Sequence, residues 1–115
     1  MAVACHRRPD GDAVGSLLAM AHWLERQGKT VGLYCFDAIP QTLGFLAGLE
    51  RIRSQVDAFW SETQAVVLVD CGDLSMAGVE AERVSGKALA VIDHHVTNPG
   101  FGAVNCINAE ASSTA

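Results

Sequence analysis

The sequence has 115 residues, which suits one compact domain, and half of them are hydrophobic, which is enough to build a core. Its formal net charge of −5 argues against a protein that coats nucleic acid, because such proteins usually present a basic face. A small anionic substrate is not excluded, since bound cations can reverse the local field.

The N-terminal half of the chain predicts a strand, a helix and a second strand. Residues 1–5 form a short apolar run. Residues 13–27 place apolar side chains on one helical face, and Gly28 supplies a helix stop. Residues 30–36 are rich in residues that favour strands. Residues 41–49 predict a further short helix, although two glycines weaken its helix propensity.

The C-terminal half continues the alternation of strands and helices. Residues 65–69, AVVLV, are almost purely apolar, which is typical of a strand covered on both faces, and residues 88–92 repeat this pattern. Residues 74–83 predict a helix between them, and residues 104–107 predict a further short strand. Strands separated by helices imply crossover connections and a parallel sheet. The predicted fold class is therefore α/β, a parallel sheet flanked by helices.

The cysteines and the apolar runs indicate the cellular compartment of the protein. The four cysteines are widely spaced and form no C-x-x-C pair, so neither a zinc ribbon nor a secreted disulfide framework is indicated, and buried, reduced thiols are expected. No signal peptide opens the chain, and no apolar run is long enough to span a bilayer. We therefore expect a cytoplasmic protein, with neither membrane nor long duplex nucleic acid as a partner.

Three of the predicted strands run into side chains that can bind metal ions. The residues that follow them are, in chain order, His6, Asp10 and Asp12, then Asp70, then Asp93, His94 and His95. In open parallel sheets ligands bind beyond the carboxyl ends of the strands, so these side chains are expected to meet at one edge. Turn and cap roles alone could explain Asp10 and Asp12, with Asp12 the predicted N-cap of the next helix. They do not explain His6 or the other two strand ends.

Carboxylates gathered in one place favour a metal-bound site. They would raise one another's pKa, and a pair of divalent cations removes that conflict. Mixed imidazole and carboxylate ligands suit Mn²⁺, Zn²⁺ or Fe²⁺ better than Mg²⁺. Two cations roughly 3.5–4 Å apart can share a carboxylate and a nucleophilic hydroxide, usually for attack on phosphorus. Asp70 is the natural shared ligand, because it is the lone acid at its strand end, between the other two clusters.

These segments resemble the motifs of the DHH phosphoesterase family. The resemblance rests on HRRPDGDAVGS at 6–16, VLVDCGD at 67–73 and IDHHVTNPGFGAVNCINAEASSTA at 92–115, which occur in family order. Together they span nearly the whole chain, and the combination is highly specific. The residues of these motifs are most similar to those of the branch of oligoribonucleases that also dephosphorylate 3′-phosphoadenosine 5′-phosphate (pAp). Cyclic-dinucleotide phosphodiesterases share similar motifs.

The resemblance implies a metal ligand at each of five positions. His6 and Asp10 would bind one cation. Asp12 and His94 would bind the second, and Asp70 would bridge the two. The implied cofactors are two divalent cations, with Mn²⁺ the expected metal.

The resemblance also implies a catalytic residue and a substrate class. His95 would face the substrate phosphate and stabilise its charge or assist the leaving group. Asp93 would not bind a cation itself but would orient the residues that do. The implied reaction is metal-dependent hydrolysis of short RNA or small nucleotide phosphates, and a homodimer is a possible state of the full-length protein.

Two parts of the family pattern lie outside the sequence. Family members carry a fourth acidic motif beyond the S-S-T-A segment, and a C-terminal substrate-binding domain with a glycine-rich basic motif. Residues 1–115 are therefore expected to be a partial DHH phosphoesterase domain from a longer enzyme. One metal position is then expected to lack a ligand, which leaves the activity of this chain open.

Three other interpretations stay open. A truncated domain of this kind could bind a nucleotide without cleaving it, as a catalytically impaired or regulatory module. The substrate could instead be a cyclic or linear dinucleotide. A receiver-like or flavodoxin-like domain also has acids at its strand ends, but it gives no role to His6, His94 and His95.

Overall fold

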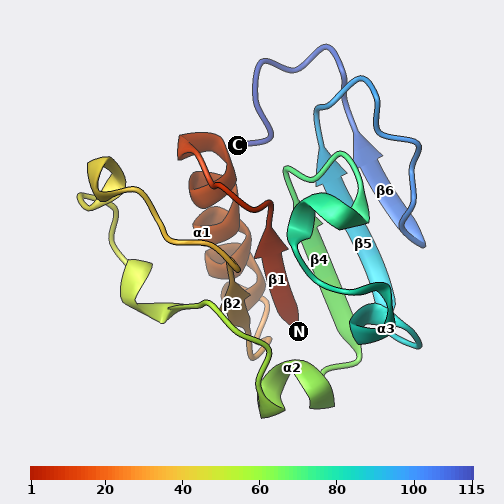
Figure 1. The fold of residues 1–115 in the computed structure, drawn as a ribbon, viewed down its shortest axis with the longest axis horizontal. Helices are drawn as coiled ribbons and strands as arrows, with labels where there is room; N and C mark the ends of the chain where they lie inside the picture. Colours follow the sequence, from red (N-terminus) through yellow and green to blue (C-terminus); the bar gives the residue numbers. More distant parts are fainter.

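The apolar runs form one sheet in which every strand pairing is parallel (Figure 1). A computed structural model describes all residues 1–115. The six strands are β1 (Ala2–Cys5), β2 (Gly32–Tyr34), β3 (Ile52–Arg53), β4 (Ala65–Val69), β5 (Ala88–Asp93) and β6 (Val104–Ile107). Their order across the sheet is β3-β2-β1-β4-β5-β6, so the chain starts in the middle and runs outward twice. The predicted parallel α/β fold is confirmed.

The helices lie on both faces of this sheet. They are α1 (Gly11–Arg26), α2 (Ala58–Glu62) and α3 (Ala81–Val84), with 3₁₀ turns at Gln41–Leu43, Leu49–Arg51 and Leu74–Ala77. Neighbouring strand residues point to opposite faces, and Val3 of β1 packs with α1, whereas Ala4 packs with α2 and α3. No helix in the structure combines the length and apolar character needed to cross a lipid bilayer.

Helix α1 is followed by Gly28 as predicted, but its N-cap is a different residue from the predicted one. The carboxylate of Asp10 accepts a hydrogen bond from the Ala13 amide at 2.9 Å, which makes Asp10 the N-cap. The prediction of Asp12 as the cap is wrong, because Asp12 already lies in the first helical turn and is free to face the sheet edge. Gly28 follows the helix with a φ of +77°, a conformation that glycine adopts without strain.

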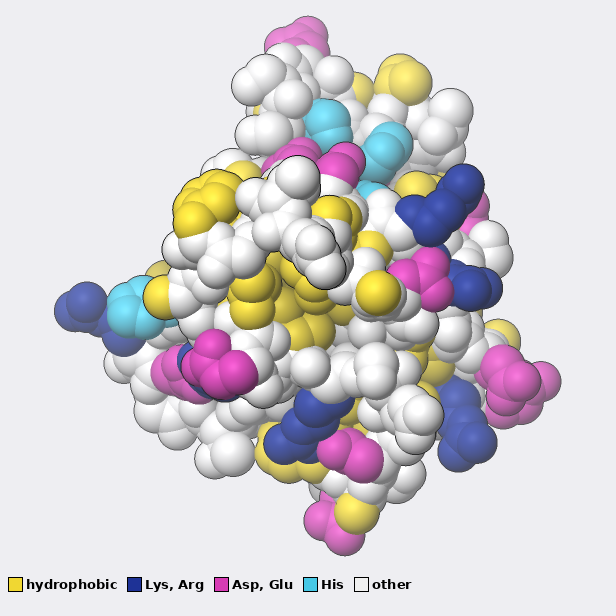
Figure 2. All heavy atoms as spheres, turned by 60° about the vertical axis from the view of Figure 1, so that its left-hand side comes forward, with side chains coloured by type: hydrophobic (Ala, Val, Ile, Leu, Met, Phe, Trp, Pro, Cys, Tyr) yellow, Lys and Arg dark blue, Asp and Glu magenta, His cyan; other side chains and the backbone are white.

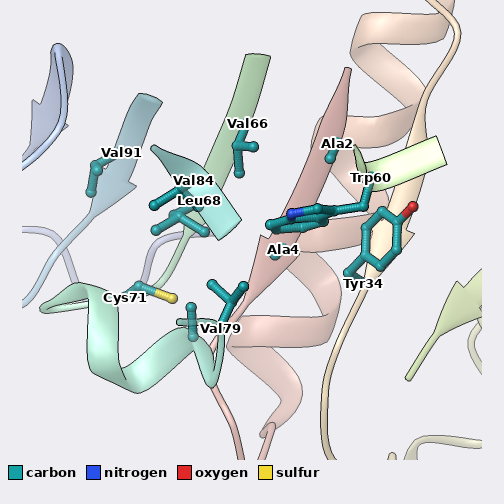
Figure 3. Packing of buried hydrophobic residues seen from close by; sticks show 11 residues of the cluster. Ala2, Ala4, Tyr34, Trp60, Val66, Leu68, Cys71, Val79, Val84 and Val91 are labelled. Atoms are coloured by element: carbon teal, nitrogen blue, oxygen red, sulfur yellow. The ribbon is translucent and has the colours of Figure 1, made fainter. Parts of the chain in front are cut away.

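The larger core lies beneath α2 and α3, where 11 buried residues pack together (Figure 3). Trp60 of α2 meets Tyr34 of β2 edge-on, with ring centroids 4.8 Å apart, and both are fully buried. The indole N–H of Trp60 donates to the Arg83 carbonyl at 3.1 Å. This bond ties α2 to α3, so two very short helices hold each other in place against the sheet.

Some predicted elements are wrong, and glycines explain most of the errors. The predicted helix at 41–49 is only a 3₁₀ turn at its start, and Gly48 near its end has a φ of +96°. The predicted helix at 74–83 breaks at Gly78, whose φ of +73° separates a 3₁₀ turn from α3. The predicted strand at 30–36 is shorter, and β3 and α2 were not expected as elements.

The cysteines are all unpaired, and three of the four are buried. Cys5, Cys35 and Cys71 match the expectation of buried thiols. Cys106 does not, because its side chain lies on the exposed outer strand β6.

Candidate metal centre and active site

The carboxyl ends of β1, β4 and β5 lie side by side, because these strands are neighbours in the sheet. Strands β2 and β3 lie on one side of β1, and β4, β5 and β6 lie on the other, so the strand order reverses between β1 and β4. Open α/β sheets form a ligand crevice at this position. Figure 2 shows histidine and acidic side chains gathered at the upper end of the molecule, with basic side chains beside them. All the strand-end residues singled out in the sequence therefore meet at one site.

Asp70 occupies the centre of this site. It is only 2 % exposed, and its φ of +58° is a left-handed conformation that few non-glycine residues adopt. Its two carboxylate oxygens face different histidines: Oδ2 lies 3.4 Å from Nε2 of His6, and Oδ1 lies 3.5 Å from Nε2 of His94. Strained backbone of this kind is concentrated at functional sites. The backbone turn places one buried carboxylate between two imidazoles.

His6, Asp10 and Asp70 form the first group that could hold a metal ion. Nε2 of His6 lies 3.8 Å from the Asp10 carboxylate, and Nδ1 of His6 lies 2.7 Å from the Arg7 carbonyl. Because that carbonyl can only accept a hydrogen bond, Nδ1 carries the proton and Nε2 is turned toward the two carboxylates. The hydrogen bond to Asp70 raises the pKa of His6 to about 9, although burial opposes it.

Asp12 and Asp70 both lie beside His94, and we refer to Asp12, Asp70 and His94 as the second group. The ligand atoms there that lie close enough together to share one ion are those of Asp70, His94 and His95. Nε2 of His94 is 3.5 Å from Oδ2 of Asp12 and 3.5 Å from Oδ1 of Asp70. Nδ1 of His94 lies 3.3 Å from the Ala111 carbonyl, which again favours a proton on Nδ1. Asp70 is therefore the residue common to both groups.

Both groups fit divalent cations. A cation about 2.1 Å from each of two ligand atoms holds those atoms roughly 3.0–3.5 Å apart. The histidine and carboxylate atoms paired here are 3.4 to 3.8 Å apart, so each of these pairs could share a cation after a small movement. Burial raises the pKa of Asp70, but hydrogen bonds from His6 and Thr114 outweigh it and keep the pKa below its usual value. The central carboxylate is thus ionised and ready to bind a cation.

His95 is held differently from the other two histidines. Its Nδ1 donates to Oδ1 of the buried Asp93 at 2.6 Å. The Asn98 amide donates to Oδ2 of Asp93 at 2.7 Å and to the Cys71 carbonyl at 3.0 Å. Burial raises the pKa of Asp93, but hydrogen bonds from Asn98 and His95 outweigh burial and keep the pKa below its usual value. Asp93 therefore stays ionised. Asp93 fixes the His95 ring and leaves Nε2 without a partner in the chain.

A cavity of about 800 Å³ opens beside these residues. Its lining residues are His6, Arg7, Arg8, Asp10, Asp37, Ser75, Met76 and His95. Arg7 forms an ion pair with Asp37 at 3.2 Å, and the same carboxylate accepts the Arg8 backbone amide at 2.9 Å. The Arg8 side chain has no partner in the chain, and its backbone is held at a φ of +52°. Arg8 is thus a free cation on the wall of the cavity.

Three site residues escaped the sequence analysis. Asn98 and Thr114 lie within the quoted D-H-H-x-T-N and S-S-T-A segments but received no role, and Asp37 lies in no motif. The five proposed ligands and His95 could be singled out because Asp and His that follow strands indicate a metal site, and the family resemblance gave them their separate roles. Asn and Thr at loop positions are too common to be singled out in the same way.

Comparisons with known proteins show which family this chain resembles. The model of the DHH family, N-terminal domain, matches residues 1–115. The chain is 32 % identical over 113 residues to the bifunctional oligoribonuclease and PAP phosphatase NrnA of Thermus thermophilus. It is 24 % identical over 109 residues to the Bacillus subtilis protein of the same name. These alignments cover 98 % and 94 % of the chain but 33 % of each relative, so the chain spans about a third of their length.

A solved structure shares the fold. The crystal structure of an exopolyphosphatase-related protein from Bacteroides fragilis superposes with a TM-score of 0.87 and 28 % sequence identity. The match covers 98 % of this chain and 36 % of the other. The two proteins therefore share the fold over nearly the whole of this chain.

Proposed function

The chain belongs to the DHH family, whose N-terminal domain it matches throughout, and from this we propose that it acts as a metal-dependent phosphoesterase on short oligoribonucleotides or small nucleotide phosphates such as pAp. The observation that carries the proposal is Asp70, whose two oxygens face two imidazoles on opposite sides. The names of the relatives from Thermus thermophilus and Bacillus subtilis supply the substrate class.

The proposed cofactors are two divalent cations, with Mn²⁺ the expected metal. One would be held by His6, Asp10 and Asp70. The other would be held by Asp12, Asp70 and His94. Bound cations of this kind polarise a phosphoryl group and neutralise its charge.

The proposed catalytic residue is His95. Asp93 occupies Nδ1, so Nε2 is the ring atom that can meet a substrate in the cavity. There Nε2 would hydrogen-bond a phosphate oxygen, or give a proton to the leaving oxygen as water bonds to phosphorus and the bond between phosphorus and that oxygen breaks. The Asn98 bond to Asp93 would keep this arrangement rigid.

The proposed activity is tested by metal removal. Purified chain with Mn²⁺ is incubated with a short oligoribonucleotide, with pAp, and with linear and cyclic dinucleotides, and the products are separated by chromatography. We expect cleavage of the oligoribonucleotide and of pAp, loss of cleavage with EDTA, and recovery with excess Mn²⁺. Binding of Mn²⁺ and nucleotide without turnover would instead support a nucleotide-binding or regulatory module.

Arg8 is expected to bind the anionic substrate. Replacing it by alanine removes the unpaired charge on the cavity wall and should raise KM for pAp about five- to tenfold, with little change in kcat, because the bond is made in both ground and transition states. Steady-state kinetics at fixed ionic strength measure this. Arg26→Ala, in the last turn of α1, is the matched control, and an equal rise in KM there would assign the effect to net charge alone.

A further inference from the structure

Thr114 reaches between two of the proposed metal ligands from the end of the chain. Its amide donates to Oδ2 of Asp12 at 2.8 Å, and its hydroxyl donates to Oδ1 of Asp70 at 2.8 Å. The Ala115 amide donates to the other oxygen of Asp12, also at 2.8 Å. Figure 1 places this end of the chain beside α1. Thr114 therefore joins two acids that precede it by 102 and 44 positions.

The bonds to Asp12 leave one oxygen available for a cation. A carboxylate oxygen has two lone-pair directions. Oδ1 of Asp12 accepts the Ala115 amide and the Ser16 hydroxyl, the latter at 3.3 Å, so both of its directions are used. Oδ2 accepts only the Thr114 amide, and this is the oxygen that lies 3.5 Å from Nε2 of His94. The free direction of Asp12 is thus on the His94 side.

The hydroxyl of Thr114 acts on Asp70 in the same way. An ionised carboxylate can only accept, so the hydroxyl must be the donor. It occupies one direction of Oδ1, the oxygen that faces Nε2 of His94, and leaves Oδ2 to His6. Thr114 thus orients both carboxylates of the second group. It makes no hydrogen bond to Asp10 or to Oδ2 of Asp70, the oxygen that faces His6.

We propose that Thr114 is a positioning residue that holds Asp12 and Asp70 in the orientation needed to bind a cation beside His94. The inference rests on the proposed function, because it concerns the same metal centre. Hydrogen-bond partners that orient metal ligands typically contribute 10- to 100-fold in metal affinity. The effect should fall on the cation beside His94 and spare the one beside His6.

The test compares a substitution that removes the hydroxyl with one that keeps it. Thr114→Val is nearly isosteric and removes the donor, whereas Thr114→Ser keeps it. Mn²⁺ binding to the full chain is measured by calorimetry and by the spin-resonance signal of free Mn²⁺. We expect Thr114→Val to weaken one of two Mn²⁺ sites about 10- to 100-fold, and Thr114→Ser to stay within about threefold of the unmodified chain.

Further variants separate positioning from a structural role. Thr114→Ala removes the hydroxyl without adding a methyl group and should weaken the same site if Thr114→Val folds poorly. Thr63→Val, at the end of α2, is the matched control and should leave both sites unchanged. Equal Mn²⁺ affinity in Thr114→Val and the unmodified chain would overturn the inference, even if the variant melts at a lower temperature.

The two proposals fail in different ways. If the unmodified chain bound two Mn²⁺ ions but hydrolysed no substrate, the proposed activity would be wrong. The inference about the effect of Thr114 on Mn²⁺ affinity would still hold. Hydrolysis that persists with unaltered Mn²⁺ affinity in Thr114→Val and Thr114→Ala would end the inference and leave the activity in place. Absence of Mn²⁺ binding by the unmodified chain would overturn both.

Discussion

Replacing Asp70 by asparagine is expected to lower kcat/KM about 1000-fold and to abolish high-affinity binding of the second Mn²⁺ ion. The substitution removes the one negative charge that both candidate metal groups share. A cation that polarises a phosphoryl oxygen stabilises the transition state by several kcal/mol, and about 1.4 kcal/mol corresponds to a tenfold change in rate. Steady-state kinetics with Mn²⁺ and a calorimetric count of bound ions measure both effects.

Asparagine is the informative replacement because it is expected to preserve the fold. Asp70 has a φ of +58°, and asparagine is among the few residues that adopt this conformation readily. An alanine there would add backbone strain to the loss of charge. Glu62→Gln, at the exposed end of α2, makes the same change in net charge away from the site and should keep full activity. Activity within tenfold of the unmodified chain in Asp70→Asn would show that the shared-ligand hypothesis is wrong.

The parts of the fold that follow from local chemistry could be predicted from the sequence. β4 and the apolar part of β5 are almost uninterrupted runs of branched or small apolar residues, which are stable only when both faces are covered. Parallel pairing then brings their carboxyl ends together. For that reason Asp70 and His94 could be expected at one site, although their positions in the chain are separated by a whole crossover.

The parts that were missed depend on distant contacts. Helix α2 has only five residues, and it is held by the Asp57 side chain at its N-cap and by the Trp60 bond to the Arg83 carbonyl. No local pattern of this length specifies a helix. The contact of Thr114 with Asp12 spans 102 positions and depends on how the last loop folds back over α1. The metal-binding roles of the strand-end residues remain predictions, because they need an ion to test them.

Replacing His95 by asparagine is expected to lower kcat about 10²- to 10⁴-fold, the range for removal of a general acid, with Mn²⁺ affinity unchanged. The asparagine amide can take the place of Nδ1 and keep the bond to Asp93, so the variant removes Nε2 with the outer part of the ring. The buried Asp93 and its bond from Asn98 then stay satisfied, and the fold should be preserved. Kinetics with pAp and calorimetry with Mn²⁺ give the two quantities.

The comparison of these two quantities decides what His95 does. Its Nδ1 lies 3.9 Å from Oδ1 of Asp70, so a role as a metal ligand is the alternative to be tested. That role conflicts with the 2.6 Å bond to Asp93, which already occupies Nδ1. If Mn²⁺ affinity fell together with kcat in His95→Asn, His95 would be a ligand rather than a proton donor. His22→Asn, on the exposed side of α1, is the matched control and should change neither quantity, because it lies far from the strand ends along the helix.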